Sequence, residues 1–260
     1  MDREINAVAA IAFRDFSKFT HDRVRILATF IFPALFIGIL GTSLQSNLSG
    51  RVGFDFLTFT FTGVLAQTLF QSTASGIISL IEDRESDFSQ EMFVSPISRY
   101  SIIIGKIIGE SLVALVQGVG IVAFGLILGV SFEWGQILAV LPVAIVICLL
   151  GGAFGLLVLT NLSNQRSANQ IFPFLIFPQF FLAGVFNPIK NLPFFLWALS
   201  RLSPMTYAVD LMRSVFYSGQ PEYPKVVLYN IPIDLLIIGC MLLLFITLGT
   251  FLFVRNERNR

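Results

Sequence analysis

Three polar side chains recur at helical spacing within the apolar stretch at residues 54–81. Gln67, Gln71 and Ser75 stand at positions i, i+4 and i+8, so they share one face of a helix. Hydroxyl groups lie beside this face on Thr68, Ser72 and Ser79. In apolar surroundings such groups either form hydrogen bonds between helices or line the wall of a transport route. The sequence leaves both interpretations open.

Two ionisable residues lie one turn apart in the next apolar stretch, at residues 102–130. Glu110 is costly to bury in an apolar helix, which makes it a candidate functional group. A carrier driven by protons or sodium would need a titratable side chain of this kind. The simpler interpretation is that Lys106, at i−4, pairs with Glu110 near the end of the helix, and we expect this pair.

Three further charged residues lie in apolar surroundings nearer the end of the chain. Asp210 and Arg213 stand at i and i+3, and we expect them to form an ion pair. Asp234 follows near the start of the last apolar stretch, where we expect it to reach polar headgroups. The only histidine, His21, is assigned no role.

The motifs of common catalytic sites are missing from the sequence. It contains no Gly-x-x-x-x-Gly-Lys-Ser/Thr phosphate loop, which argues against nucleotide hydrolysis by that route. It also lacks the His-Glu-x-x-His metal motif and the Gly-x-Ser-x-Gly nucleophile turn. Cys148 and Cys240 each lie within an apolar run and indicate neither a disulfide nor a metal site. We therefore expect the chain not to be an enzyme, with no catalytic residue, metal or cofactor of its own.

The composition is that of a protein surrounded by lipid. Of the 260 residues, 55% are hydrophobic, 28 are phenylalanine and only 13% are charged. Soluble domains carry roughly 25% charged residues. Charged residues stand here in short clusters between long uncharged runs. The sequence therefore predicts an all-α integral membrane protein, with residues 1–260 forming a single transmembrane domain.

Six segments are apolar enough to cross a bilayer, which takes about 20 residues per helix. The predicted spans are residues 26–44, 54–81, 102–130, 136–160, 170–186 and 231–254. The fifth is short and is interrupted by Pro173 and Pro178. Residues 192–215 are moderately apolar but contain prolines and charges, so they predict short re-entrant helices packed against protein.

The distribution of Lys and Arg predicts the orientation of the spans. With the N-terminus in the cytoplasm, twelve of these residues lie inside and five outside. The outside set is Arg51, Lys190, Arg201, Arg213 and Lys225. We therefore expect a multi-pass protein of the cell inner or plasma membrane with both termini cytoplasmic, as six spans require.

Residues 4–24 predict an amphipathic helix lying in the cytoplasmic interface. Its apolar stripe contains Ile5, Val8, Ala9, Ala12, Phe13, Phe16 and Phe19. Arg14, Lys18, His21 and Asp22 fall on the opposite side, together with one apolar exception, Ile11. Packing of this helix on a partner protein is the alternative interpretation.

Two pairs of glycines predict places where helices approach closely. Gly105 and Gly109, and likewise Gly151 and Gly155, are spaced i, i+4.

The connection after the second span is unusual for a cytoplasmic loop. It begins with acidic residues, continues with Met92, Phe93 and Val94, and its helical part ends at Pro96. A loop has little reason to expose such side chains to water. It therefore either docks on a partner or folds back on the membrane.

Two parts of the chain resemble ABC-2 type exporter permeases, most closely the drug-resistance and nodulation-factor exporter branch. Asp83-Arg84-Glu85, EMFVSPISR at residues 91–99 and Gly105-Lys106 are similar to the first cytoplasmic loop of that family. FPQFFLAGVFNPIKNLP at residues 177–193 and RLSPMTYAVDLMR at residues 201–213 are similar to its fifth-span signature and the segment that follows.

The resemblance implies that residues 86–98 form a coupling helix that docks on a separate ATPase. Met92, Phe93 and Val94 would be its apolar anchors and Glu85, Glu91 and Arg99 its charged rim, with Pro96 at its end. Two ATPase copies, carrying ATP and magnesium, would bind a permease homodimer in lipid. No nucleic acid partner is expected.

The resemblance further implies export of an amphipathic or hydrophobic drug, lipid or glycan. We hypothesise that two copies enclose a route lined by the first, second and fifth spans. Polar groups of the second span, Gln67, Gln71 and Ser75, and Phe174, Phe177 and Phe181 of the fifth would meet the cargo. The alternative function is an ion-coupled secondary transporter that uses Glu110.

Overall fold

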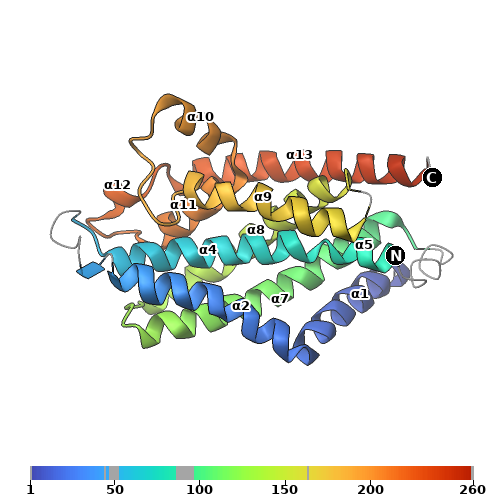
Figure 1. The fold of residues 1–260 in the computed structure, drawn as a ribbon, viewed down its shortest axis with the longest axis horizontal. Helices are drawn as coiled ribbons and strands as arrows, with labels where there is room; N and C mark the ends of the chain where they lie inside the picture. The colour runs from blue at the N-terminus through green and yellow to red at the C-terminus, as the bar shows by residue number, and fades with distance from the viewer. Residues whose placement is uncertain (1, 44, 47–52, 86–96, 163, 259–260) are drawn as a thin grey trace.

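The computed structural model describes residues 2–43, 45–46, 53–85, 97–162 and 164–258. Within these ranges all regular elements are helices, which confirms the all-α prediction. They lie mostly side by side along one axis (Figure 1). The start of α1 (Asp2–His21), α5 (Ser79–Glu85) and the end of α13 (Ile231–Arg258) lie at the same end of this bundle.

Five segments of the described chain have the length and apolar composition of a membrane span. They are Arg23–Gly41, Phe56–Asp83, Arg99–Ile127, Trp134–Leu159 and Tyr223–Phe253. The first comprises α2 (Arg23–Leu35) and a π-helical turn η1 (Phe36–Gly41), and the third and fourth are α7 and α8. The fifth predicted span, residues 170–186, overlaps α9 (Gln165–Leu182). This helix contains Pro173 and Pro178 and is not among the five.

The second predicted span is not one continuous helix. α4 (Phe56–Gly76) ends at a turn through Ile77 and Ile78, and α5 continues from Ser79. Asp55 begins α4 because its carboxylate accepts the first free backbone N–H groups, from Leu57 and Thr58.

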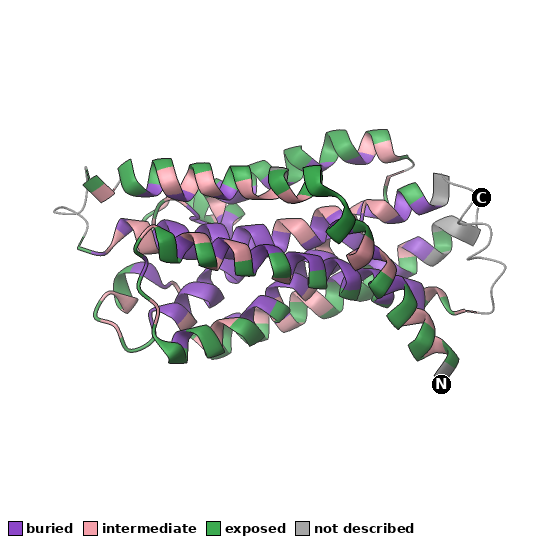
Figure 2. Cartoon of the chain, turned by 90° about the horizontal axis from the view of Figure 1, so that it is seen from below, coloured by how far each residue is buried: buried purple, intermediate pink, exposed green. Residues whose placement is uncertain are grey.

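α4 is the central helix, in contact with α7, α8 and α11 (Pro204–Phe216). Its side chains Phe59, Phe61, Val64 and Phe70 are fully buried. Figure 2 shows buried residues gathered along the middle of the bundle and exposed residues on the outer faces.

Glycines bring the α8 and α4 backbones together, as their spacing predicts. A Cβ on Gly151 would lie 2.3 Å from the carbonyl oxygen of Phe70, and one on Gly155 would lie 2.3 Å from that of Ala74. Any larger residue would therefore separate the two helices.

Gly105 and Gly109 of α7 form a shallow groove in which α1 packs, which we call the glycine groove. Cβ atoms there would lie 3.1 Å from Ile11 and from Ala12. α1 accordingly buries Ile11, Ala12, Asp15 and Phe19.

Part of the predicted apolar stripe of α1 faces away from the protein, as a helix at a lipid interface allows, and the interfacial position stays a prediction. Ile11 is buried, whereas Phe13 and Ile5 are 72% and 58% exposed. The helix is turned toward the glycine groove of α7, which admits the face containing Ile11 and Asp15 and leaves Phe13 outside.

Two short helices follow α9, as the prolines of residues 192–215 predict. α10 (Phe194–Leu202) is largely exposed, and α11, which begins at Pro204, is buried against α4 and α8. With α12 (Tyr223–Val226) they lie at the end of the bundle opposite α5 (Figure 1).

Candidate functional site

The polar face of α4 lines a hollow between three helices. Gln67, Gln71 and Ser75 contribute to a cavity of about 320 Å³, together with Arg25 and Thr29 of α2. Its remaining lining residues are Phe32, Pro33, Thr68, Ser72 and Gln117. We call this hollow the polar groove. The predicted α4 face therefore borders open space as well as other helices.

Two amide oxygens in the polar groove have no hydrogen-bond donor among the described residues. Gln67 donates its Nε2 to Gln71 Oε1 at 2.6 Å, and Gln117 donates its Nε2 to Thr29 Oγ1 at 3.5 Å. The Oε1 atoms of Gln67 and Gln117 are buried without a partner. Because a buried acceptor without a donor costs free energy, the polar groove favours a ligand that supplies donors.

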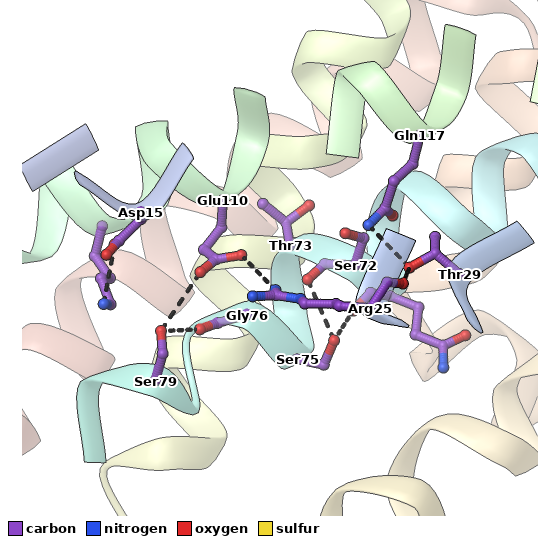
Figure 3. A network of polar contacts seen from close by, with 12 residues as sticks. Asp15, Arg25, Thr29, Ser72, Thr73, Ser75, Gly76, Ser79, Glu110 and Gln117 are labelled. Carbon is purple, nitrogen blue, oxygen red and sulfur yellow. Dashed lines mark hydrogen bonds and ion pairs between the residues drawn. The ribbon is translucent and has the colours of Figure 1, made fainter. Parts of the chain in front are cut away.

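Arg25 links the polar groove to Glu110 of α7 (Figure 3). Its Nη2 lies 3.4 Å from Glu110 Oε2, and Ser79 Oγ lies 3.4 Å from Glu110 Oε1. Glu110 itself is 2% exposed, whereas the Arg25 side chain is 41% exposed. The carboxylate packs directly on Gly76, where a Cβ would lie only 2.0 Å from Oε2. The predicted pair of Glu110 with Lys106 was wrong, because Glu110 turns toward α2 and α5.

Lys106 instead belongs to a buried cluster of charges that joins α1, α5 and α7. Its Nζ donates a 2.8 Å hydrogen bond to Asp83 Oδ2 and lies 2.9 Å from Asp15 Oδ2, the latter an ion pair without hydrogen-bond geometry. Arg14 Nη2 donates to Asp15 at 2.9 Å and to Asp83 at 2.5 Å. We call Arg14, Asp15, Asp83 and Lys106 the ionic cluster. Opposite charges and mutual hydrogen bonds are what make such burial tolerable.

The predicted pair of Asp210 and Arg213 was also wrong. The Asp210 carboxylate accepts backbone N–H groups of Leu228 and Tyr229, each at 2.8 Å. Arg213 donates to backbone carbonyl groups, including that of Gly184 at 2.8 Å, and its guanidinium lies 3.6 Å from the centre of the Phe59 ring. Both residues therefore fasten α11 to neighbouring loops.

Asp234 does not reach a polar surface in the described structure. It is fully buried, and Ser214 Oγ donates to its Oδ2 at 3.4 Å. The expectation that it reaches headgroups was wrong, because α11 packs over the first turn of α13.

The predicted aromatic residues of α9 lie on its outer side. Phe174, Phe177 and Phe181 are 81%, 56% and 53% exposed. The Phe177 ring lies 5.8 Å from that of Phe180, which lies 6.2 Å from the ring of Phe32 in the polar groove. Rings of α9 therefore continue from the edge of the polar groove onto the outer surface.

Most of the predicted ATPase-coupling residues lie outside the described residues. These are Glu91, Met92, Phe93, Val94 and Pro96. Glu85 is the last residue of α5, and Arg99 is the first residue of α7.

The segment that leads into α7 is attached to α1. The backbone N–H of Ser98 donates to both carboxylate oxygens of Glu4 at 3.2 Å. Hydrogen bonds from Ser101 and Ser98 hold the pKa of Glu4 below its usual value. The ionic cluster and this contact fix both ends of the connection that contains residues 86–96.

Sequence reasoning assigned no role in these two sites to several of their residues, among them Arg25, Asp15, Asp83 and Gln117. A signal existed for two of them. Asp15 follows Ile11 at i+4, and Gln117 follows Glu110 at i+7, so each continues a buried face. No grouping of His, Cys, Asp and Glu suited to a metal ion occurs in the described part of the chain.

Comparison with known proteins agrees with this architecture. Residues 6–217 match the family model for the ABC-2 type transporter. A transport permease of Cyanophora paradoxa, ycf38, is 25% identical over 201 residues, which cover 74% of this chain and 68% of the relative. The inner membrane transport permease YadH of Escherichia coli is 24% identical over 76% of this chain and 77% of the relative. YbhR of Escherichia coli, whose name describes a multidrug ABC transporter permease, is 29% identical over 54% of this chain but only 38% of its own length. The chain belongs to the ABC-2 type transporter family.

Proposed function

We propose that this chain is the membrane subunit of an ATP-driven exporter for an amphipathic or hydrophobic cargo. Membership of the ABC-2 type family supports a permease of an ABC transporter. The names of YbhR and YadH, a multidrug permease and an inner membrane permease, support the cargo class and the membrane. ATP and magnesium would be held by two copies of a separate ATPase subunit on a permease homodimer.

The ionic cluster is the observation that carries this proposal. Burying the charged side chains of Asp15, Asp83 and Lys106 in a largely apolar protein requires a compensating arrangement, which Arg14 completes and which joins α5 and α7 to α1. α5 and α7 are the helices that precede and follow residues 86–98. A force applied to that connection would therefore move three helices together, as a coupling helix requires.

The topology that we propose has six spans, α9 included, with both termini in the cytoplasm. Its support is that the start of α1 and the end of α13 lie at the same end of the bundle (Figure 1). α1 would lie in the cytoplasmic interface, with its exposed Phe13 and Ile5 toward lipid. α10 and α11 would be the re-entrant segment at the outer side.

The test uses the full chain purified in lipid with its proposed partner ATPase. Met92→Asp with Phe93→Asp is expected to abolish ATPase binding, because charged residues would replace both apolar anchors. The matched control, Met92→Leu with Phe93→Leu, keeps apolar anchors and should retain binding. Unchanged binding by the aspartate variant would refute docking through residues 86–98.

Burial of Glu110 in a predicted span is the feature that favours the alternative, an ion-coupled carrier. That carrier would need Glu110 to exchange protons, and its transport would not need ATP. Transport that persists in Glu110→Gln and stops when ATP is removed would reject it. Transport that requires Glu110 and an ion gradient, without ATP, would reject the exporter.

A further inference from the structure

The polar groove combines one cation with two unused acceptors. Arg25 is the charged residue on its lining, and its only salt-bridge partner among the described residues is Glu110, at 3.4 Å. The Oε1 atoms of Gln67 and Gln117 have no donor among the described residues, and because these side chains are only 1% and 3% exposed, they act as acceptors when the side chains turn toward a ligand in the groove. A matching ligand therefore carries an anion for Arg25 and hydroxyl or N–H donors for the amides.

The surroundings of the polar groove indicate that this ligand has an apolar part as well. Phe32 and Pro33 line the groove beside the polar groups. Pro33 also borders a second hollow of about 290 Å³ between α2 and α7, lined by Phe30, Ala34, Gly120, Ile121, Ala123, Phe124 and Ile127. This second lining is apolar throughout. A hydrocarbon chain suits it, and a soluble metabolite without one does not.

The position of Arg25 fits a headgroup at the surface of a leaflet. Arg25 is the third residue of α2, and after it the helix is apolar except for Thr29. In the proposed topology this places Arg25 near the cytoplasmic leaflet, where anionic headgroups lie. A ligand could therefore enter from the membrane, with its headgroup at Arg25 and its tail beside Phe32.

We propose that the polar groove binds the anionic, hydroxyl-bearing headgroup of an amphiphile. Arg25 binds the anion, and the amide oxygens of Gln67 and Gln117 accept hydrogen bonds from its hydroxyl groups. Glu110 competes with the headgroup for Arg25. This inference rests on the proposed function in taking the amphiphile to be cargo and in placing Arg25 at the cytoplasmic leaflet.

The binding test uses the full chain in detergent, with short-chain lipids as probes and native mass spectrometry as the readout. Phosphatidylglycerol has an anion and hydroxyl donors, phosphatidylmethanol has the anion alone, and phosphatidylcholine has neither a net charge nor donors. The expected order of affinity is phosphatidylglycerol, then phosphatidylmethanol, then phosphatidylcholine. Equal binding of all three would overturn the proposal.

Variants assign the contacts. Arg25→Gln should weaken both anionic probes about tenfold, the equivalent of about 1.4 kcal/mol. Arg23→Gln makes the same charge change on the same helix outside the groove lining, and should alter binding less than about twofold. Equal losses of affinity in the two variants would mean that any positive charge on α2 attracts the lipid, and this would overturn the proposed site.

Two further variants separate recognition from a merely structural role. Glu110→Gln should strengthen binding of the anionic probes, because it releases Arg25 while preserving the side-chain shape. Gln67→Leu with Gln117→Leu should lower phosphatidylglycerol binding to the level of phosphatidylmethanol and leave phosphatidylmethanol unchanged. Weaker binding in Glu110→Gln would overturn the competition, and equal losses for both probes would overturn the role of the amides.

A last experiment distinguishes cargo from a resident membrane lipid. The chain and its ATPase are reconstituted in phosphatidylcholine vesicles that contain labelled phosphatidylglycerol. ATP-dependent movement of the label between leaflets, lost in Arg25→Gln, is expected. Binding without movement would overturn the assignment as cargo, whereas failure of the ATPase to bind would overturn the proposed function and leave headgroup binding intact.

Discussion

Replacing Lys106 by methionine removes a buried cation from the ionic cluster while keeping most of the apolar length of the side chain. Lys106 is 1% exposed, and its carboxylate partners Asp15 and Asp83 are 3% and 6% exposed. After the substitution, two buried carboxylates share one closely paired cation, Arg14. The two buried carboxylates then have one close cation fewer, in a site largely shielded from water.

The expected loss of folding stability follows from the burial of these charged groups. Removal of one partner from a buried ion pair costs about 3–5 kcal/mol, because the remaining charge stays desolvated. For domains of this size, each kcal/mol lowers the midpoint of thermal unfolding by about 2–4 °C. We therefore expect Lys106→Met to lower the midpoint by about 6–20 °C.

The assay uses the natural cysteines of the chain. Cys148 is fully buried, whereas Cys240 is exposed on α13. In a Cys240→Ser background, a dye that fluoresces on reaction with a thiol reports unfolding through Cys148 alone. Parent and variant are heated in the same detergent, and their midpoints are compared.

Lys18→Met is the matched control because Lys18 lies at the rim of the same cluster. Its Nζ is 3.7 Å from Asp83, and its side chain is 59% exposed. Exposed pairs contribute about 0–1 kcal/mol, so the expected shift is below about 4 °C. Adding Asp83→Asn to Lys106→Met should restore part of the loss. Equal shifts for Lys106→Met and Lys18→Met would refute the reasoning.

Three further substitutions test other contacts. Gly151→Leu should prevent close packing of α8 on α4 and abolish folded protein on gel filtration, whereas Gly239→Leu, with open space at its Cβ position, should not. Arg213→Lys should lower the thermal midpoint, because one ammonium cannot reproduce the planar guanidinium that reaches three carbonyl groups and covers a ring. The Glu4 carboxylate has its pKa depressed in the folded chain, so its stabilising contact with Ser98 is present above its ordinary pKa of 4.5 and is lost as pH falls below it. As the pH is lowered through this range, the Ser98 amide of the parent should lose protection from hydrogen exchange, whereas that of Glu4→Gln should not. Parallel curves of protection against pH for the two proteins would contradict this.

Sequence alone could predict those features that depend on composition and local spacing. Long apolar runs predicted the helices that can cross a bilayer, because the bilayer thickness requires about 20 apolar residues per helix regardless of which helices pack beside it. The spacing of Gly151 and Gly155 predicted close approach because small side chains at i and i+4 leave a flat helix surface. Pro204 separated two short helices because proline fits the first turn of the second one.

The ion pairs could not be predicted in the same way. Lys106 and Glu110 are i, i+4 neighbours, so a local argument pairs them, yet each binds residues distant in sequence. Tertiary packing decides the outcome, because Gly109 admits Asp15 from α1 and Gly76 admits the Glu110 carboxylate toward α5. Nothing in the local sequence shows which helix will occupy a glycine groove.

Gly76 lies just before α5, the helix that contacts both the ionic cluster and Glu110, and this position gives a last prediction. Lys106 and Glu110 lie one turn apart on α7 and both reach α5, at Asp83 and at Ser79. A displacement of α5 relative to α7 therefore changes the ionic cluster and the Arg25–Glu110 contact together.

Gly76→Ala should separate these effects. The new Cβ would lie 2.0 Å from Glu110 Oε2 and 2.7 Å from its Cγ, so the Glu110 side chain must leave its place beside Arg25. Residues 86–98 are unchanged, so the ATPase should still bind, while stimulation of its ATP hydrolysis by cargo should be lost. Retained stimulation would mean that the position of Glu110 does not matter for coupling, whereas loss of ATPase binding would mean that the turn at Gly76 supports the docking segment itself.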